Sequence, residues 1–301
     1  MSMIEVADHP AALPSGIFER SQRLPPHLFF MVSAVFHYLG PAFAVLLFAS
    51  VAPLGVAWLR IVTAALIFAA WRRPWRSFAQ LAPADCRVVV ALGLVLAAMN
   101  ASFYLAIARL PLATVGAIEF LGPIALAAIG IRSLRNAGAL ALAIGGVAIL
   151  TQVRLAGEPL GYFFAFANCG LFVLYVILSH RLAQGGGMYG IDRLGAAMLV
   201  AAIAAAPLGL SDATPALFSP MLLLAAVGVG VSSSVIPYVA DQLAMARLSR
   251  GSFALMLALL PATATVIGFA VLQQAPSAVE LVGIALVIAG VAIHRPIKDK
   301  I

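Results

Sequence analysis

The sequence carries little charge. Only 10% of its 301 residues are Asp, Glu, Lys or Arg, whereas 63% are hydrophobic, and the mean hydropathy is +1.08. Soluble globular domains contain about 25% charged residues. This composition therefore excludes a soluble domain and indicates a chain that lies in a lipid bilayer.

Cysteine and the usual catalytic motifs are also scarce. The two cysteines, Cys86 and Cys169, lie far apart in the sequence and form neither a disulfide framework nor a CxxC metal pair. No HExxH motif, no GxxxxGK[ST] loop and no Ser/His/Asp set is present, so we predict no metal, no cofactor and no enzyme activity. The alternatives from other classes are an intramembrane lipid-modifying enzyme and a non-transporting membrane scaffold.

Acidic residues are fewer than basic ones, 11 against 18, and the net charge is +7. The basic residues form no cluster interleaved with aromatic residues, so we do not expect nucleic-acid binding. In membrane proteins Lys and Arg gather in cytoplasmic loops. Residues 1–27 have no apolar core and are predicted to be a cytoplasmic tail instead of a cleavable signal peptide.

Apolar runs of about 20 residues, which is the length needed to cross a bilayer, recur along the chain. They predict an all-α membrane protein with ten transmembrane helices. The expected spans are 28–50, 53–71, 88–108, 111–131, 136–152, 159–180, 194–210, 218–245, 251–272 and 277–294.

The distribution of Lys and Arg predicts the orientation of these spans. With a cytoplasmic N-terminus, 15 of the 18 basic residues fall on the cytoplasmic side. Arg109 and Arg154 fall on the other side, and Arg60 lies inside a span. The positive-inside rule thus favours both termini, including a short tail at 295–301, in the cytoplasm.

The chain also contains an internal repeat. The hexapeptide at 105–110 recurs at 243–248, an offset of 138 residues that also carries Pro123 onto Pro261. A unit of five helices has an odd number of spans, so its two copies cross the membrane in opposite directions. We predict two inverted five-helix repeats, 28–152 and 159–294, around a central cavity, the arrangement that alternating access uses.

Glu119 is the strongest functional candidate, because it lies near the middle of an apolar span. A carboxylate there costs about 2.5–3.5 kcal/mol on insertion scales and should face a cavity or a partner. The structural alternative is a neutral carboxyl hydrogen-bonded between helices. Pro123, one turn later, is expected to kink this span, and its repeat counterpart Pro261 is expected to kink the corresponding span of the second repeat.

Arg60 is the one cation well inside a span, where it can pair with Glu119, bind a substrate carboxylate or extend towards the interface. His37 and Tyr38 precede a second expected kink at Pro41. For His37 we consider a proton-coupling role beside the more common role of a buried packing residue.

Further polar candidates lie in other spans. Asn100 and Tyr104 are four residues apart and share one helix face, and Tyr175 either lines the cavity or packs between helices. A third expected kink, Pro237, precedes Tyr238 and Asp241. Because Asp241 lies about one turn from the end of its span, we expect a solvated, interfacial position for it.

These residues resemble the drug/metabolite transporter superfamily, in its EamA-domain branch, which includes inner-membrane threonine/homoserine exporters. The resemblance covers about residues 28–294 and is most specific in two stretches. They are Met99–Tyr104 and the motif Glu119-Phe120-x-Gly122-Pro123.

The resemblance implies a ten-helix exporter of amino acids or related metabolites, exchanging them for protons. Carried over position by position, it marks the following residues: Arg60, Asn100, Tyr104, Glu119, Pro123, Tyr175, Pro237, Tyr238 and Asp241. The chain departs from the family at Leu260, Gln274 and Val45, where charged residues are common. Those departures favour a more apolar or aromatic substrate.

Together these observations predict a secondary transporter in the inner membrane that exports threonine- or homoserine-like amino acids, or related small metabolites, by alternating access. The predicted partners are a small-molecule substrate, the lipid bilayer and a proton as coupling ion. The alternative is a multidrug or quaternary-ammonium exporter on the same fold, for which an ionised Glu119 in an aromatic cavity would be suited.

Overall fold

The computed structural model describes residues 24–79, 81–128, 134–152, 158–183, 187–248, 253, 257 and 260–293. Regular structure within these ranges is helical throughout, with no strand. The helices are α2 (Pro26–Leu47), α3 (Pro53–Arg72), α4 (Pro74–Ala79), α5 (Pro83–Ile107), α6 (Leu112–Ala128), α7 (Leu134–Gln152), α8 (Pro159–Ala183), α9 (Gly187–Leu217), α10 (Pro220–Gly230), the π-helix η1 (Val231–Val235), α11 (Ile236–Met245), α13 (Leu260–Leu272) and α14 (Ala278–Ile293).

Six helical segments are long and apolar enough to cross a membrane. They are α2, α3, α5, α8, most of α9, and the continuous run from Pro220 to Met245. Helices α6, α7, α13 and α14 overlap the other four predicted spans, of which 129–131 and most of 251–259 lie outside the described residues. Proline opens many of these helices, for example at Pro53 and Pro83, where its fixed φ and missing N–H cost nothing.

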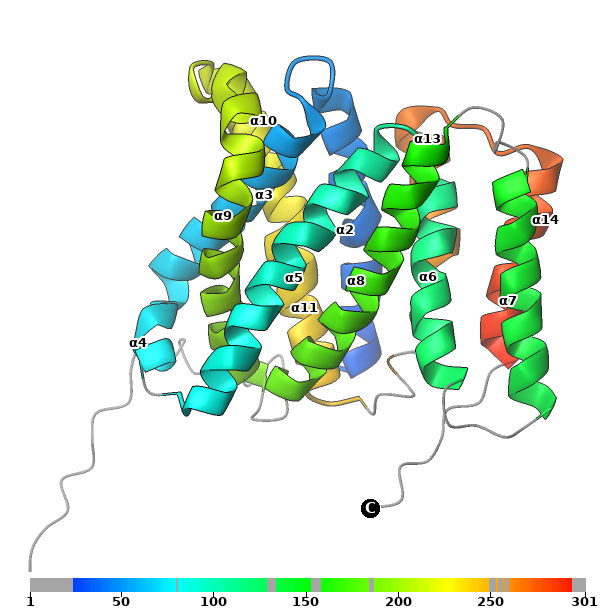
Figure 1. Ribbon diagram of the computed structural model, residues 1–301, viewed down its shortest axis with the longest axis horizontal. Helices are drawn as coiled ribbons and strands as arrows, with labels where there is room; N and C mark the ends of the chain where they lie inside the picture. The colour runs from blue at the N-terminus through cyan, green and yellow to red at the C-terminus, as the bar shows by residue number, and fades with distance from the viewer. Residues whose placement is uncertain are drawn as a thin grey trace, which may run out of the picture.

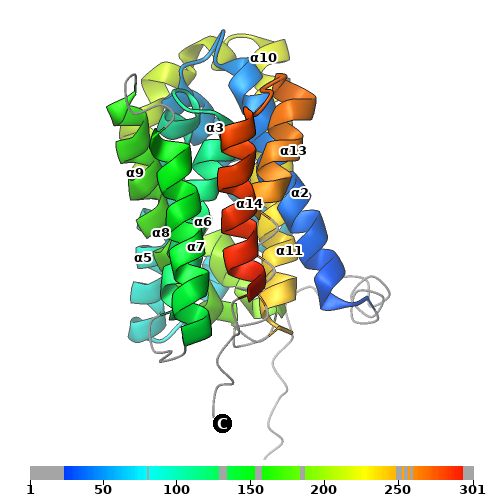
Figure 2. The ribbon, with the colours of Figure 1, turned by 90° about the vertical axis from the view of Figure 1, so that its right-hand side faces the viewer.

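Successive long helices run in alternating directions and form one bundle (Figure 1). Segments from distant parts of the chain interleave: α2 packs against α11 and α13, and α5 packs against α8 and α9. Helices α7 and α14 pack on each other at one edge of the bundle, as Figures 1 and 2 both show. The interior is consequently built from both the N-terminal and the C-terminal parts of the chain.

Glycines allow the closest contacts between helices in this interior. A Cβ added at Gly40 on α2 would collide with Ser233 of η1, and one added at Gly230 would lie 2.5 Å from Cβ of Thr63 on α3. Small residues of this kind let membrane helices approach backbone to backbone. They hold η1 between α2 and α3.

The π-helix η1 is the main departure from the predicted spans. The run 218–245 was expected to be one span with a kink at Pro237, but the structure instead widens the five residues Val231–Val235 into a π-helix. Such π segments are common at functional sites, since they alter the hydrogen bonding of the helix backbone. Here the carbonyl oxygen of Ser233 accepts a hydrogen bond from a side chain of another helix.

The two ends of the bundle differ in charge. Arg72 ends α3, Arg181 lies in the last turn of α8 and Arg247 follows α11, so these arginines share the end at which α2 begins. Arg72 also forms an ion pair with Asp192, with 2.6 Å between Nε and Oδ1. Arg109, in the connection from α5 to α6, lies at the opposite end.

Candidate functional site

Glu119 lies in the middle of α6 and is 3% exposed. The hydroxyl of Tyr38 on α2 donates to its Oε2 at 3.0 Å, and Nδ2 of Asn168 on α8 donates to its Oε1 at 2.9 Å. Nε2 of His37 lies 3.6 Å from the same Oε2. Both oxygens of this buried carboxylate therefore have donors, as burial of a charge requires.

Asp241 forms a second buried carboxylate site. It is 6% exposed, so the expected solvated position is wrong. Ser33 on α2 donates to Oδ1 at 2.5 Å, and the hydroxyl of Tyr175 on α8 donates to Oδ2 at 3.4 Å. The prediction used only the distance of Asp241 from the end of α11, whereas α2, α8 and the side chain of Phe253 cover this turn.

Arg60 on α3 is 4% exposed and does not extend to the interface. Its Nε donates to Oγ of Ser234 at 2.7 Å and its terminal nitrogen to the carbonyl oxygen of Ser233 at 2.7 Å. The guanidinium carbon lies 5.5 Å from the ring centre of Tyr104 and 6.0 Å from that of Tyr238. Its hydrogen-bond partners among the described residues are neutral, so Arg60 presents a positive charge that no hydrogen-bonded carboxylate neutralises.

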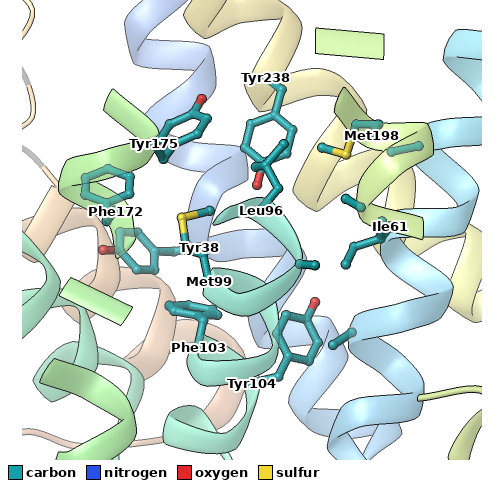
Figure 3. Close-up of a cluster of buried hydrophobic side chains, with 14 of the residues drawn as sticks. Tyr38, Ile61, Leu96, Met99, Phe103, Tyr104, Phe172, Tyr175, Met198 and Tyr238 are labelled. Carbon is teal, nitrogen blue, oxygen red and sulfur yellow. The ribbon is translucent and has the colours of Figure 1, made fainter. Parts of the chain in front are cut away.

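Aromatic and amide side chains complete the interior. Figure 3 shows Tyr38, Tyr104, Tyr175 and Tyr238 reaching one region from separate helices. Asn100 on α5 donates from Nδ2 to the carbonyl oxygen of Leu96 at 2.7 Å. These predicted residues lie in or beside the group of buried polar side chains around Glu119, Arg60 and Asp241, which we call the polar centre.

Two small cavities border this centre. The first is lined by His37, Arg60, Met99, Asn100, Phe103, Glu119, Asn168 and Tyr238. The second is lined by Phe30, Ser33, His37, Phe172, Tyr175, Asp241, Phe253, Leu257 and Leu260. Each measures about 10 Å³, roughly the space that one water needs, and His37 lies between them. Neither of these two cavities has room for an amino acid.

A larger cavity of about 370 Å³ lies at the end of the bundle that carries Arg109. Arg109, Thr114, Gln274 and Glu280 contribute its polar lining. Two of these side chains also accept hydrogen bonds from backbone N–H groups. Gln274 accepts from the N–H of Leu112 at 3.1 Å, and Glu280 accepts from the N–H of Ser277 at 2.8 Å.

Two of the four predicted kink prolines lie inside helices, and the other two lie near helix starts. Helix α2 continues through Pro41, and Pro123 lies within α6. Pro237 directly follows the π-helix, and Pro261 is buried at the second residue of α13. Pro237 thus lies where the helix geometry changes.

Two residues of the site escaped the sequence prediction. Asn168 is fully buried and contacts Glu119, and Ser33 contacts Asp241. Asn168 is an amide within an apolar run, the signal that identified Asn100. Ser33 gave no such signal, because single serines are ordinary in membrane helices. Within the described ranges, no group of three or more His, Cys, Asp or Glu is placed to hold a metal ion.

Known proteins resemble this chain in sequence. The profile of the EamA-like transporter family matches residues 159–294. The chain is 29% identical to threonine/homoserine exporter RhtA of Salmonella typhimurium strain SL1344 over 257 residues, 83% of this chain and 84% of the relative. RhtA of Escherichia coli strain K12 is 28% identical over the same shares. Residues 159–294 therefore match the EamA-like transporter family, and the relatives support a transporter similar to those of the drug/metabolite transporter superfamily. The chain is a multi-pass membrane protein and not an enzyme.

A solved structure shares the fold of this chain. One crystal structure matches with a TM-score of 0.58 and 22% sequence identity, covering 89% of this chain and 95% of the other. At that identity the match supports the fold alone.

Proposed function

We propose that this protein is an EamA-type transporter that exports zwitterionic amino acids of the threonine or homoserine type, or closely related metabolites, across the inner membrane. Transport proceeds by alternating access in exchange for protons. The relatives named as threonine/homoserine exporters support the substrate class.

The observation that carries this proposal is a pair of opposite charges on one cavity. Arg60 and Glu119 both line the first small cavity, and both are buried. A zwitterion offers a carboxylate to the guanidinium and an ammonium to the carboxylate, and buried complementary charges give specificity. Asn168 adds an amide oxygen that has no hydrogen-bond partner among the residues the structure describes and can accept from the ammonium or from a hydroxyl.

The same pair of charges disfavours the quaternary-ammonium alternative. A cationic drug bound at Glu119 would lie in a cavity that Arg60 also lines, and like charges repel strongly where water is excluded. Arg60 therefore selects against substrates that carry only positive charge.

The closed cavity requires a conformational change for transport. Space for one water cannot hold an amino acid, so the helices around Arg60 and Glu119 must separate on one side at a time. Pro41, Pro237 and η1 interrupt the regular backbone where bending is least costly.

We further propose that ten membrane spans form two inverted repeats at 28–152 and 159–294, with tails 1–27 and 295–301 in the cytoplasm. The family match coincides with the second of these ranges. The arginines gathered at the end where α2 begins support a cytoplasmic location for that end.

The test is transport of labelled threonine, homoserine and aromatic amino acids in proteoliposomes with an imposed pH gradient. We expect wild-type protein to transport an amino acid, and Glu119→Gln and Arg60→Gln to lose most of that transport. Matched controls are Glu158→Gln and Arg87→Gln, which change exposed residues outside the cavity and should transport normally.

Two outcomes would contradict the proposal. One is that folded wild-type protein transports no amino acid. The other is that Arg60→Gln transports amino acids normally while raising the flux of a quaternary-ammonium dye, which would favour a drug exporter.

A further inference from the structure

The two buried carboxylates bridge the same two helices. Glu119 accepts from Tyr38 on α2 and Asn168 on α8, and Asp241 accepts from Ser33 on α2 and Tyr175 on α8. Each carboxylate thus holds one donor from the N-terminal part of the chain and one from the C-terminal part. Helices α2 and α8 stay together in this structure through both carboxylates.

His37 lies between these carboxylates on α2. Its Nε2 is 3.6 Å from Oε2 of Glu119, and its ring also lines the second cavity, together with Ser33 and Asp241. Its ring packs against that of Phe172 on α8, with 6.0 Å between centres. The second cavity has about the volume of one water, which can bridge the imidazole to Asp241.

The charges around His37 favour one bound proton. The charged or titratable side chains that face this region are Glu119 from α6, Asp241 and Tyr238 from α11, Arg60 from α3, Tyr175 from α8 and Tyr38 from α2 itself. With neutral tyrosines, two carboxylates and one guanidinium leave a net charge of −1. Burying net charge is costly, and one proton makes the closed centre neutral.

We propose that His37 carries this proton between Glu119 and Asp241, and so connects two proton-binding carboxyls within one transport cycle. The inference rests on the proposed exchange of substrate for protons. The Glu119 carboxyl gives its proton to Nε2 of neutral His37, which becomes imidazolium. The imidazolium then releases one proton, through the water-sized cavity, to the Asp241 carboxylate and is again neutral. Glu119 is left ionised and free to pair with a substrate ammonium.

The experiment compares two fluxes in the same proteoliposomes. One is accumulation of labelled amino acid driven by a pH gradient, and the other is exchange of labelled for unlabelled substrate at equal pH. For His37→Gln and Asp241→Asn we expect the ratio of driven flux to exchange flux to fall about tenfold or more. This is the size of change expected when binding of the proton and binding of the substrate are no longer coupled. The double variant should lower the ratio no further than either single change. His27→Gln, an exposed histidine on the same helix, should keep the wild-type ratio.

A second measurement needs no substrate. Infrared difference spectra of purified protein at low and high pH report protonated carboxyls. A proton shared through His37 predicts that Glu119→Gln and Asp241→Asn each alter the protonated-carboxyl band. When His37 is already replaced by Gln, only one of these two carboxyl substitutions should alter the protonated-carboxyl band.

A wild-type ratio of driven to exchange flux in either His37→Gln or Asp241→Asn would overturn the proposal. So would an infrared response that is the same with and without His37. If wild-type protein exchanges no amino acid but the infrared bands behave as expected, the proton route stands and the substrate proposal fails.

Discussion

Replacing Gly40 by alanine tests whether the contact between α2 and η1 sets the closed structure. An added Cβ would collide with Cβ, Cα and N of Ser233, and two of those atoms belong to the backbone. Overpacking of this kind costs about 1–3 kcal/mol. The better helix propensity of alanine returns roughly 0.5–1 kcal/mol. We therefore expect a net loss of up to about 2.5 kcal/mol, or a fall of several degrees in Tm.

Gly138 on α7 provides the matched control. A Cβ added there meets nothing within 4 Å, so Gly138→Ala keeps or slightly raises stability through helix propensity alone. The measurement is thermal unfolding of both variants in one detergent, followed by amino-acid exchange. Equal melting temperatures for Gly40→Ala and Gly138→Ala would refute the close packing of α2 on η1.

Two further predictions concern single contacts. Asn168→Leu removes the donor 2.9 Å from Glu119, and a hydrogen bond to a charged group contributes about 1.5–3 kcal/mol. We expect kcat/KM for transport to fall roughly 10- to 100-fold, and an unchanged value would exclude Asn168 from the site. Arg72 and Asp192 form two hydrogen bonds, at 2.6 and 3.1 Å, so a double-mutant cycle with Arg72→Gln and Asp192→Asn should show a coupling of about 1 kcal/mol in unfolding. Additive single effects would show that this ion pair adds nothing to stability.

The sequence predicted an all-helical membrane protein correctly, because hydropathy reports membrane burial directly, and six helical segments of the described residues are long and apolar enough to cross a bilayer. It also selected Glu119 and Arg60, since a charge inside a span needs a partner or a cavity. It did not predict η1, whose widened turn depends on contacts with Gly40 from a distant helix. It placed Asp241 in solvent because position along one helix says nothing about which other helices cover that turn.

Arg60 shows the same limit in another form. Pairing with Glu119 was one of three roles expected for Arg60, beside binding of a substrate carboxylate and extension towards the interface. The structure instead satisfies the guanidinium with Ser234 and with the carbonyl oxygen of Ser233, a bond to the π-helix backbone. Sequence spacing cannot reveal this arrangement, because α3 and η1 are about 170 residues apart and meet only in the folded bundle.

The charge state of Glu119 and Asp241 affects how easily α2 and α8 separate, because both carboxylates accept hydrogen bonds from these two helices. Separating α2 from α8 removes one donor from Glu119 and one from Asp241 at the same time, because Tyr38 and Ser33 lie on α2 whereas the other donors lie on α8. Each lost bond to an ionised carboxylate costs about 1.5–3 kcal/mol unless water, a proton or a cation replaces it. Opening is therefore cheapest when a substrate ammonium or a proton reaches the carboxylates as the helices part. Without a substrate ammonium or a proton, opening leaves both carboxylates short of one donor, and this penalty on movement of the empty carrier is what an exchanger requires.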